Sequence, residues 1–227
     1  MASVTEKWRT ERFSAAVYDA AVEHERVARV AGSAMWAADT RKLFAYIARA
    51  AGMPAGSSIL DVPCGGGLGF RGLRPGQDVR YVAADISPYM LQRARKEARH
   101  RHVEDQIEFV AGDITALEFL DASFDLCVTY NGLHCLPDPR AALTELGRVL
   151  KPGGTLRGTS CVTGRALRSD ALIAIFRRVE TFGNTPRAGA IETWLTELGF
   201  EHVAIECSGA IEFFEAQLPK PRSTDGP

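Results

Sequence analysis

Residues 59–67 read Ile-Leu-Asp-Val-Pro-Cys-Gly-Gly-Gly, and this stretch decides the fold. A short apolar run ends in an acidic residue and then breaks into a glycine-rich turn, which is how a buried parallel strand meets a loop that closely approaches a ligand. Glycine suits such a loop because a Cβ atom would occupy the ligand's space and because the turn requires unusual backbone dihedrals. The stretch therefore predicts a binding crevice at the end of a central strand.

A second apolar run repeats this arrangement. Residues 79–84 are followed by Asp85, about 20 residues beyond the glycine-rich turn, and an acid at this distance suits the two hydroxyls of a ribose. Asp61 and Asp85 each also have a simpler interpretation, as a strand-end acid or as the partner of a helix cap. Together, beside a glycine-rich turn, they favour an enzyme that uses a nucleoside cofactor.

Strand-like and helix-like segments alternate along the chain, which is typical of a doubly wound, mostly parallel α/β sheet. Ser87-Pro88 and Asp138-Pro139 each place a capping residue before a proline, so each predicts a helix start. Residues 202–207 and 211–217 are close enough to form an antiparallel hairpin at the edge of the sheet. The other strands are expected at residues 58–62, 79–84, 107–111, 124–130 and 154–159.

Two segments lie outside this minimal unit. Residues 1–50 are expected to form a helical cap, and residues 165–183 have apolar side chains at helical spacing. The second segment is either a lid over the crevice or a plain core helix, since both fit the pattern equally well. The main domain is expected at residues 51–219, and residues 220–227, rich in proline and polar residues, are expected to form a frayed tail.

The composition of the chain indicates its cellular compartment and the kinds of partner it can bind. The chain of 227 residues is 46% apolar and has a net charge of −1, so it can bury a sizeable core but offers no broad basic field for nucleic acid. The basic run at residues 92–102 is interpreted as the solvated face of a helix. Five scattered cysteines without a Cys-x-x-Cys pair predict free thiols and no metal site. Without a signal-peptide core or a membrane-length apolar stretch, the protein is expected to be cytoplasmic.

Six motifs follow one another along the chain, at residues 60–67, 84–87, 112–114, 124–126, 134–139 and 148–154. In this order they resemble the motifs of class I S-adenosylmethionine-dependent methyltransferases, in particular the small-molecule group that includes the ubiquinone/menaquinone-biosynthesis type. The resemblance covers roughly residues 55–217 and implies a Rossmann-like seven-stranded sheet with an antiparallel last strand. One departure is Pro63, where the family usually has glycine. Proline fixes φ and removes an N–H donor, so one backbone contact to the cofactor is expected to be missing.

The resemblance implies contacts to the methionine and ribose parts of S-adenosylmethionine. Asp61, Gly65 and Gly67 would line the methionine moiety, and Asp85 would bind both ribose hydroxyls. Asn131, just beyond the fourth strand, would lie near the methionine moiety or the methyl acceptor.

The resemblance also implies contacts to adenine. Ile86 would pack on one face of the base, Asp113 would accept from its amino group, and the Ile114 backbone N–H would meet a ring nitrogen. Asp113 also suits an ordinary turn. The predicted cofactor-binding set is Asp61, Pro63, Cys64, Gly65, Gly67, Asp85, Ile86, Met90, Asp113, Ile114 and Asn131.

Candidates for catalysis and acceptor binding are fewer. His134 is the only histidine near the expected mouth of the crevice, and it suits either a general base or packing on the next helix. Tyr18, Trp36 and Tyr46 lie in the N-terminal addition, where they suit either an acceptor pocket or simple core packing. No cluster of metal ligands is visible in the sequence.

These observations favour methyl transfer from S-adenosylmethionine to a small, partly apolar acceptor that is aromatic, quinone-like or lipid, with S-adenosylhomocysteine as the product. Two alternatives stay open. An NAD-linked oxidoreductase shares the glycine-rich turn, although this chain lacks an obvious Tyr-x-x-x-Lys pair and a full Gly-x-Gly-x-x-Gly register. A non-catalytic S-adenosylmethionine-binding regulator would share every motif. A homodimer is compatible with the sequence.

Overall fold

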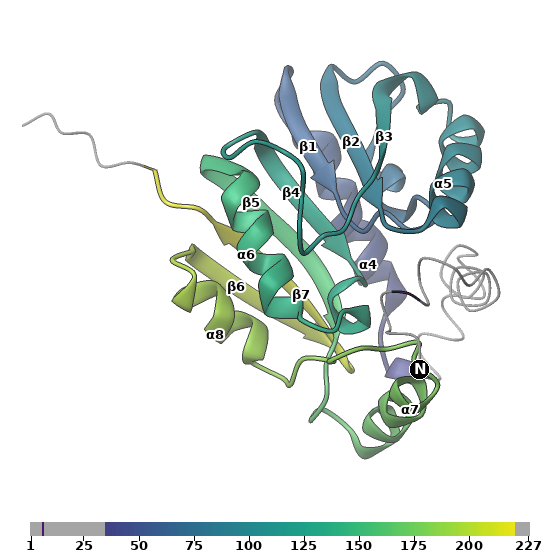
Figure 1. The fold of residues 1–227 in the computed structure, drawn as a ribbon, viewed down its shortest axis with the longest axis vertical. Helices are drawn as coiled ribbons and strands as arrows, with labels where there is room; N and C mark the ends of the chain where they lie inside the picture. Colours follow the sequence, from purple (N-terminus) through teal and green to yellow (C-terminus); the bar gives the residue numbers. More distant parts are fainter. Residues whose placement is uncertain (1–5, 7–34, 221–227) are drawn as a thin grey trace, which may run out of the picture.

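A computed structural model describes Glu6 and residues 35–220 of the chain. A seven-stranded sheet with the order β3-β2-β1-β4-β5-β7-β6 runs through the middle of the molecule (Figure 1). The strands β1 to β5 are parallel to one another. The strand bounds are β1 Ser57–Asp61, β2 Val79–Asp85, β3 Ile107–Ala111, β4 Phe124–Tyr130, β5 Leu150–Cys161, β6 Glu201–Ser208 and β7 Ile211–Gln217.

The predicted hairpin forms at the sheet's edge and contains the antiparallel strand. β7 pairs in antiparallel fashion with both β5 and β6, so it lies one strand in from the edge, and the outermost strand β6 runs with the others. The expected fold, a mostly parallel seven-stranded sheet with an antiparallel last strand, is confirmed.

Helices cover both faces of the sheet, as expected for a doubly wound fold. One buried cluster packs α4 and α5 against one face, and a second packs α6 and α8 against the other. The clusters are apolar throughout, so hydrophobic burial fixes both layers. The helix bounds are α4 Thr40–Ile47, α5 Pro88–His100, α6 Pro139–Val149, α7 Leu167–Arg178 and α8 Ala190–Glu197.

Both predicted helix caps are present. The Ser87 hydroxyl accepts from the Met90 backbone N–H at 3.4 Å, and an Asp138 carboxylate oxygen accepts from the Ala141 N–H at 3.0 Å. Each cap satisfies an N–H group that has no partner within its helix, and each is followed by proline at the first helical position. The caps start α5 and α6 just beyond strand ends, at the edge of the sheet that forms the candidate site.

The N-terminal addition is described only in part. Of the expected cap at residues 1–50, the structure describes Glu6 and residues 35–50, which include α4; the rest lies outside the described residues, as do residues 221–227 of the expected tail. α7 lies away from the sheet (Figure 1). Its inner side contributes the buried Ile173 and the half-buried Phe176 to an apolar cluster. Within the described part of the chain, no helix is long and apolar enough to cross a membrane.

Candidate functional site

A cavity opens where the parallel strands end, the position at which open α/β sheets bind ligands. Together with the open solvent at its mouth it encloses about 750 Å³. The segments that follow β1, β2, β3 and β4 supply its walls. The lining residues are Val62, Pro63, Asp85, Ile86, Met90, Gly112, Asp113, Ile114, Thr115, Asn131, Gly132, Cys135, Leu136 and Pro137.

Asp85 is the acidic group at the centre of this arrangement. It ends β2, is only 5% exposed, and lines the cavity. One carboxylate oxygen accepts from the Gly65 N–H at 2.9 Å and the other from the Ser87 N–H at 2.8 Å. Burial raises the pKa of Asp85 to about 6, although both backbone hydrogen bonds favour the charged form. The carboxylate thus joins the glycine-rich turn to the start of α5 and presents negative charge to the cavity.

Asp61 lies outside the cavity lining. It is 1% exposed and accepts a hydrogen bond from the Tyr81 hydroxyl at 2.8 Å. A Cβ atom added at Gly69 would come within 2.3 Å of its carboxylate, so the chain after the glycine-rich turn packs closely over Asp61. Burial raises the pKa of Asp61 to about 7. The structure therefore does not bring Asp61 and Asp85 into one lining, and contact between Asp61 and a cofactor stays a prediction.

The glycines of the turn have different surroundings. Gly65 and Gly67 both have positive φ, at 53° and 96°, a conformation that favours glycine. A Cβ atom at Gly65 would meet nothing within 4 Å, whereas one at Gly67 would lie 2.5 Å from the Phe70 ring. Gly67 is thus needed for packing as well as for its dihedral angle. Neither glycine lines the cavity, and neither does the buried Cys64, whose N–H donates to the Ala84 carbonyl.

The predicted adenine side does come together in the cavity. Ile86, Met90 and Ile114 supply apolar surface, and Asp113 supplies a carboxylate. Asp113 also organises its own turn, because it accepts from the Thr115 N–H at 2.9 Å and from the Thr115 hydroxyl at 2.7 Å. A lining that combines these apolar side chains with the carboxylates of Asp85 and Asp113 fits an adenosine moiety, whose base is flat and whose amino and hydroxyl groups donate.

Arg148 on α6 holds the segment that follows this turn. Its guanidinium donates to the carbonyls of Leu117 and Phe119 and to the carboxylates of Asp121 and Glu145, at 2.6–2.9 Å. Glu145 in turn accepts from the Leu117 N–H at 2.9 Å. A planar guanidinium with several fixed donors suits this kind of bridging. The adenine-side wall is thereby tied to a core helix.

Pro63 and Asn131 form another part of the wall. A Cβ atom at Gly132 would lie 2.5 Å from the Pro63 ring, so proline at 63 packs against glycine at 132. Asn131 has a φ of 55°, which asparagine tolerates better than most residues. Its N–H donates to the Thr159 carbonyl at 2.9 Å, and its side-chain carbonyl accepts from the Thr159 hydroxyl at 3.0 Å. Both residues line the cavity, in agreement with the prediction that they lie near a ligand.

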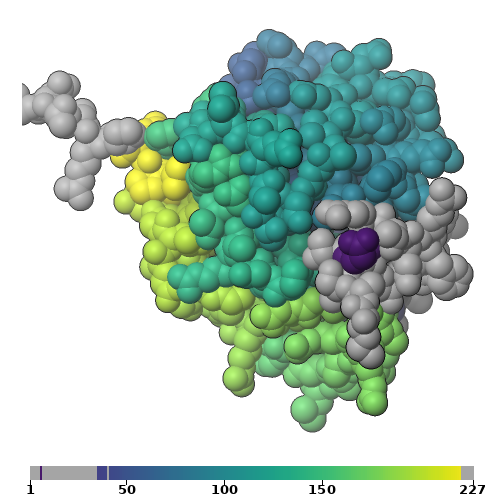
Figure 2. All heavy atoms as spheres, viewed as in Figure 1, coloured from purple at the N-terminus to yellow at the C-terminus, as the bar shows by residue number. Residues whose placement is uncertain are grey.

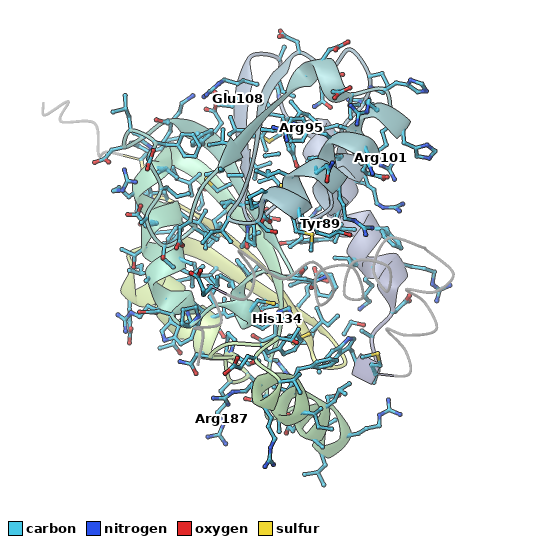
Figure 3. The ribbon with its side chains drawn as sticks, turned by 45° about the vertical axis from the view of Figure 1, so that its right-hand side comes forward. Tyr89, Arg95, Arg101, Glu108, His134 and Arg187 are labelled. Atoms are coloured by element: carbon cyan, nitrogen blue, oxygen red, sulfur yellow. The ribbon has the colours of Figure 1, made fainter. Side chains whose placement is uncertain are left out.

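His134 is placed in the interior, between the sheet and α7 (Figure 3). It is 0% exposed, its ring lies 4.4 Å from the Phe182 ring, and its Nδ1 accepts from the Cys161 N–H at 3.2 Å. Burial lowers its pKa to about 3, so the ring is neutral near pH 7. It does not line the cavity. The geometry favours the packing role that the sequence left open over the role of a general base.

Replacing His134 tests this assignment. We expect His134→Leu to lower the free energy of unfolding by about 1–3 kcal/mol, because the buried Cys161 N–H loses its acceptor. Methyl transfer should stay within a few-fold of wild type under folding conditions. Urea unfolding measures the change in the free energy of unfolding, and initial rates measure the change in activity. His100→Leu, on the exposed end of α5, is the control and should change neither. A hundredfold loss of rate in a folded His134→Leu protein would restore the catalytic role.

The aromatic residues of the N-terminal addition pack in the core where they are described. Tyr46 is buried, donates to the Phe214 carbonyl and meets the Phe213 ring edge-on. Trp36 stacks on Phe182 at 6.0 Å between ring centroids. Neither lines the cavity, so their predicted contact with an acceptor has no support from the geometry. Tyr18 lies outside the described residues.

Several lining residues were absent from the predicted set. Cys135, Leu136 and Pro137 form the end of the cavity that lies beyond Asn131, and Gly112 and Thr115 flank Asp113. All except Thr115 belong to motifs that carried the family resemblance, so the signal was present. The remaining two, Val62 and Gly132, directly neighbour Pro63 and Asn131 in the sequence.

Comparison with known proteins identifies a methyltransferase-like segment that covers a little under half of the chain. Residues 60–157 match the family model described as "Methyltransferase domain". Over 103 residues the chain is 38% identical to a ubiquinone/menaquinone biosynthesis C-methyltransferase of Roseobacter denitrificans, an alignment that covers 45% of this chain and 41% of that protein. Over 108 residues it is 41% identical to a demethylmenaquinone methyltransferase of Clavibacter sepedonicus, covering 48% and 42%. Over these residues the chain therefore has the sequence of a methyltransferase domain.

The solved structures agree with this assignment at the level of the fold. A Haemonchus contortus phosphoethanolamine N-methyltransferase 2, in complex with S-adenosyl-L-methionine, superposes with a TM-score of 0.68 at 18% identity and covers 80% of this chain and 53% of that one. The alignments with the two curated relatives span about two-fifths of the length of each. This chain thus shares the methyltransferase domain with the two curated relatives. The alignments do not identify its methyl acceptor.

The raised pKa of Asp61 predicts a pH dependence. An acid whose pKa rises on folding contributes stability below its unfolded value, near 4, and that contribution is lost as the pH rises through the folded value of about 7. We therefore expect the stability of the wild-type methyltransferase domain, relative to Asp61→Asn, to fall on the order of 2 kcal/mol between pH 5 and pH 8. Denaturant unfolding at several pH values measures this difference. A constant difference across that range would contradict the burial of Asp61.

Proposed function

We propose that the chain binds S-adenosylmethionine in the cavity at the strand ends and transfers its methyl group to a small, partly apolar acceptor. Asp85 carries the proposal: it is a buried carboxylate in the cavity lining, beside the apolar side chains of Ile86 and Ile114. In this arrangement Asp85 accepts from the ribose hydroxyls. Ile86 and Ile114 contact the adenine, and Asp113 accepts from its amino group.

The chemistry required of the protein is limited. S-adenosylmethionine supplies a methyl group already activated by a positively charged sulfur. The chain's own residues must bind and orient the acceptor at near-attack distance and exclude water. Among the described residues that line the cavity, Asp85, Asp113 and Cys135 are the titratable ones. Since the first two are assigned to the nucleoside and burial raises the pKa of the Cys135 thiol, the acceptor is one that already supplies its electron pair, such as a phenolate or a stabilised carbanion.

The surface beyond Asn131 supports a partly apolar acceptor. Gly132, Cys135, Leu136 and Pro137 line it, and none of these side chains carries a charge at neutral pH. The names of the curated relatives, which refer to quinone biosynthesis, agree with this choice of acceptor class.

Calorimetric titration of the purified chain tests the cofactor. S-adenosylmethionine and S-adenosylhomocysteine should bind at micromolar concentrations, and NAD should not bind. Binding of NAD alone would replace the proposal with the oxidoreductase alternative. Turnover with labelled S-adenosylmethionine and a panel of phenols, quinols and fatty acids tests the acceptor. Tight cofactor binding without turnover on any of them would favour the non-catalytic alternative.

A further inference from the structure

α7 has a feature that the cavity does not use: apolar side chains project from its outer side. Leu167 is 90% exposed, Ile175 58% and Val179 50%. Residues 167, 171, 175 and 179, the last of which is the C-cap residue, are spaced four apart, which places them on one side. The opposite side contributes Ile173 and Phe176 to the core, so α7 is apolar on both sides but buried on only one. Large apolar side chains grouped on an exposed surface mark an interaction site.

Arginines surround these apolar side chains. Arg168, Arg177 and Arg178 are exposed on α7, and Arg187 is exposed on a neighbouring segment. Thr163 and Arg187 form a β-bridge just before α7, and Figure 3 shows Arg187 at the outer edge of the molecule beside this helix. Figure 2 shows the segment that contains α7 projecting from one end of the molecule.

The two acidic groups on and next to α7 in the described part of the chain do not pair with Arg177 or Arg178. Asp170 is half-buried and accepts from the Gly164 N–H at 2.8 Å, and Glu180 is half-buried after the helix. Among the described residues, no ion pair holds Arg177 or Arg178. The basic helix α5 differs in two ways. Arg101 at the end of α5 pairs with Glu97 at 2.6 Å, and the large aliphatic side chains of α5 lie at buried positions.

We propose that the outer side of α7 docks on an anionic lipid surface. Leu167, Ile175 and Val179 would enter the boundary between headgroups and acyl chains, while the arginines contact lipid phosphates, as in other interfacial helices. Charge complementarity favours this partner over a second copy of the chain, whose equivalent surface would bring arginines against arginines. The proposal does not depend on methyl transfer.

Vesicle flotation with the full chain tests it. The protein should float with vesicles of phosphatidylcholine and phosphatidylglycerol at low salt and not with phosphatidylcholine alone. Arg177→Gln/Arg178→Gln should weaken binding about fivefold for each arginine removed. The matched control Lys96→Gln/Arg99→Gln, which removes the same charge from the exposed side of α5, should leave binding unchanged.

An apolar variant separates lipid insertion from charge alone. Leu167→Ser/Ile175→Ser should abolish flotation, whereas Leu120→Ser, at a site 83% exposed elsewhere, should not. Circular dichroism confirms that each variant is folded. Absence of flotation by the wild-type chain, equal binding to both kinds of vesicle, or unchanged binding by both α7 variants would overturn the proposal. So would a dimer in sedimentation analysis that Leu167→Ser/Ile175→Ser converts to monomer, since that would assign α7 to self-association.

Discussion

Replacing Asp85 with alanine should weaken S-adenosylmethionine binding about a hundredfold or more. The carboxylate is assigned to two ribose hydroxyls, and each hydrogen bond to a charged group contributes about 1.5–3 kcal/mol. The substitution also removes the acceptor of the Gly65 and Ser87 N–H groups, which loosens the glycine-rich turn. Isothermal titration of wild-type and Asp85→Ala proteins with S-adenosylhomocysteine measures the change in Kd.

Asp125→Ala is the matched control for this experiment. Asp125 lies near the start of β4, whereas Asp85 ends β2, but it likewise joins two elements, because it accepts from the Ser58 N–H and the Lys151 ammonium, each at 2.8 Å. It does not line the cavity. Its removal should reduce stability without changing Kd. If Asp85→Ala binds with wild-type affinity, the nucleoside is not held as proposed.

Filling the cavity should abolish cofactor binding without unfolding the protein. Gly112 lines the cavity, its φ lies outside the left-handed region, and a Cβ atom there would meet nothing within 4 Å. Gly112→Trp can therefore place an indole in the open space that the adenosine would occupy. We expect no measurable binding of S-adenosylhomocysteine, which is a loss of more than about a hundredfold in affinity.

Two further variants make this result specific. Gly112→Ala adds only one methyl group and should retain binding within about tenfold. Gly52→Trp places the same indole where a Cβ atom also meets nothing within 4 Å, but away from the cavity, and should bind as wild type. Thermal unfolding should show similar midpoints for all three variants. Normal binding by Gly112→Trp would show that the nucleoside occupies another place.

The fold was predictable because its signals are local. The bounds of β3, β4 and β7 match the predicted segments to the residue, since each is a short apolar run between turn residues. β5 was placed four residues too late, at 154 instead of 150. Lys151-Pro152-Gly153 stands at the junction of the helix and the strand, where proline and glycine suit the end of a helix. The helix does end at Val149, but the strand begins at once and accommodates the proline at a register shift in its pairing with β4.

The position of a site residue was predictable only where its neighbours in the sequence determine it. Ile86 and Asn131 directly follow strands, and Asp113 is the second residue after one, so their place at the strand ends follows from the topology. The surroundings of Asp61 and His134 depend on distant partners. The Tyr81 hydroxyl engages Asp61, and Phe182 and Cys161 enclose His134. These contacts join segments that no local pattern connects, so the sequence left both packing and functional roles open.

The Arg148 bridge has a kinetic consequence. Four hydrogen bonds fasten the chain beyond Asp113 to α6 before any ligand arrives, so an incoming nucleoside would find its proposed base-binding wall assembled. The encounter then needs no slow ordering of that wall, and the association rate of the cofactor is set by diffusion to the cavity mouth. Arg148→Met removes the hydrogen bonds of Arg148, so the wall would have to become ordered after the ligand has bound. Cofactor binding would then occur in two steps, and the observed binding rate would level off at high ligand concentration.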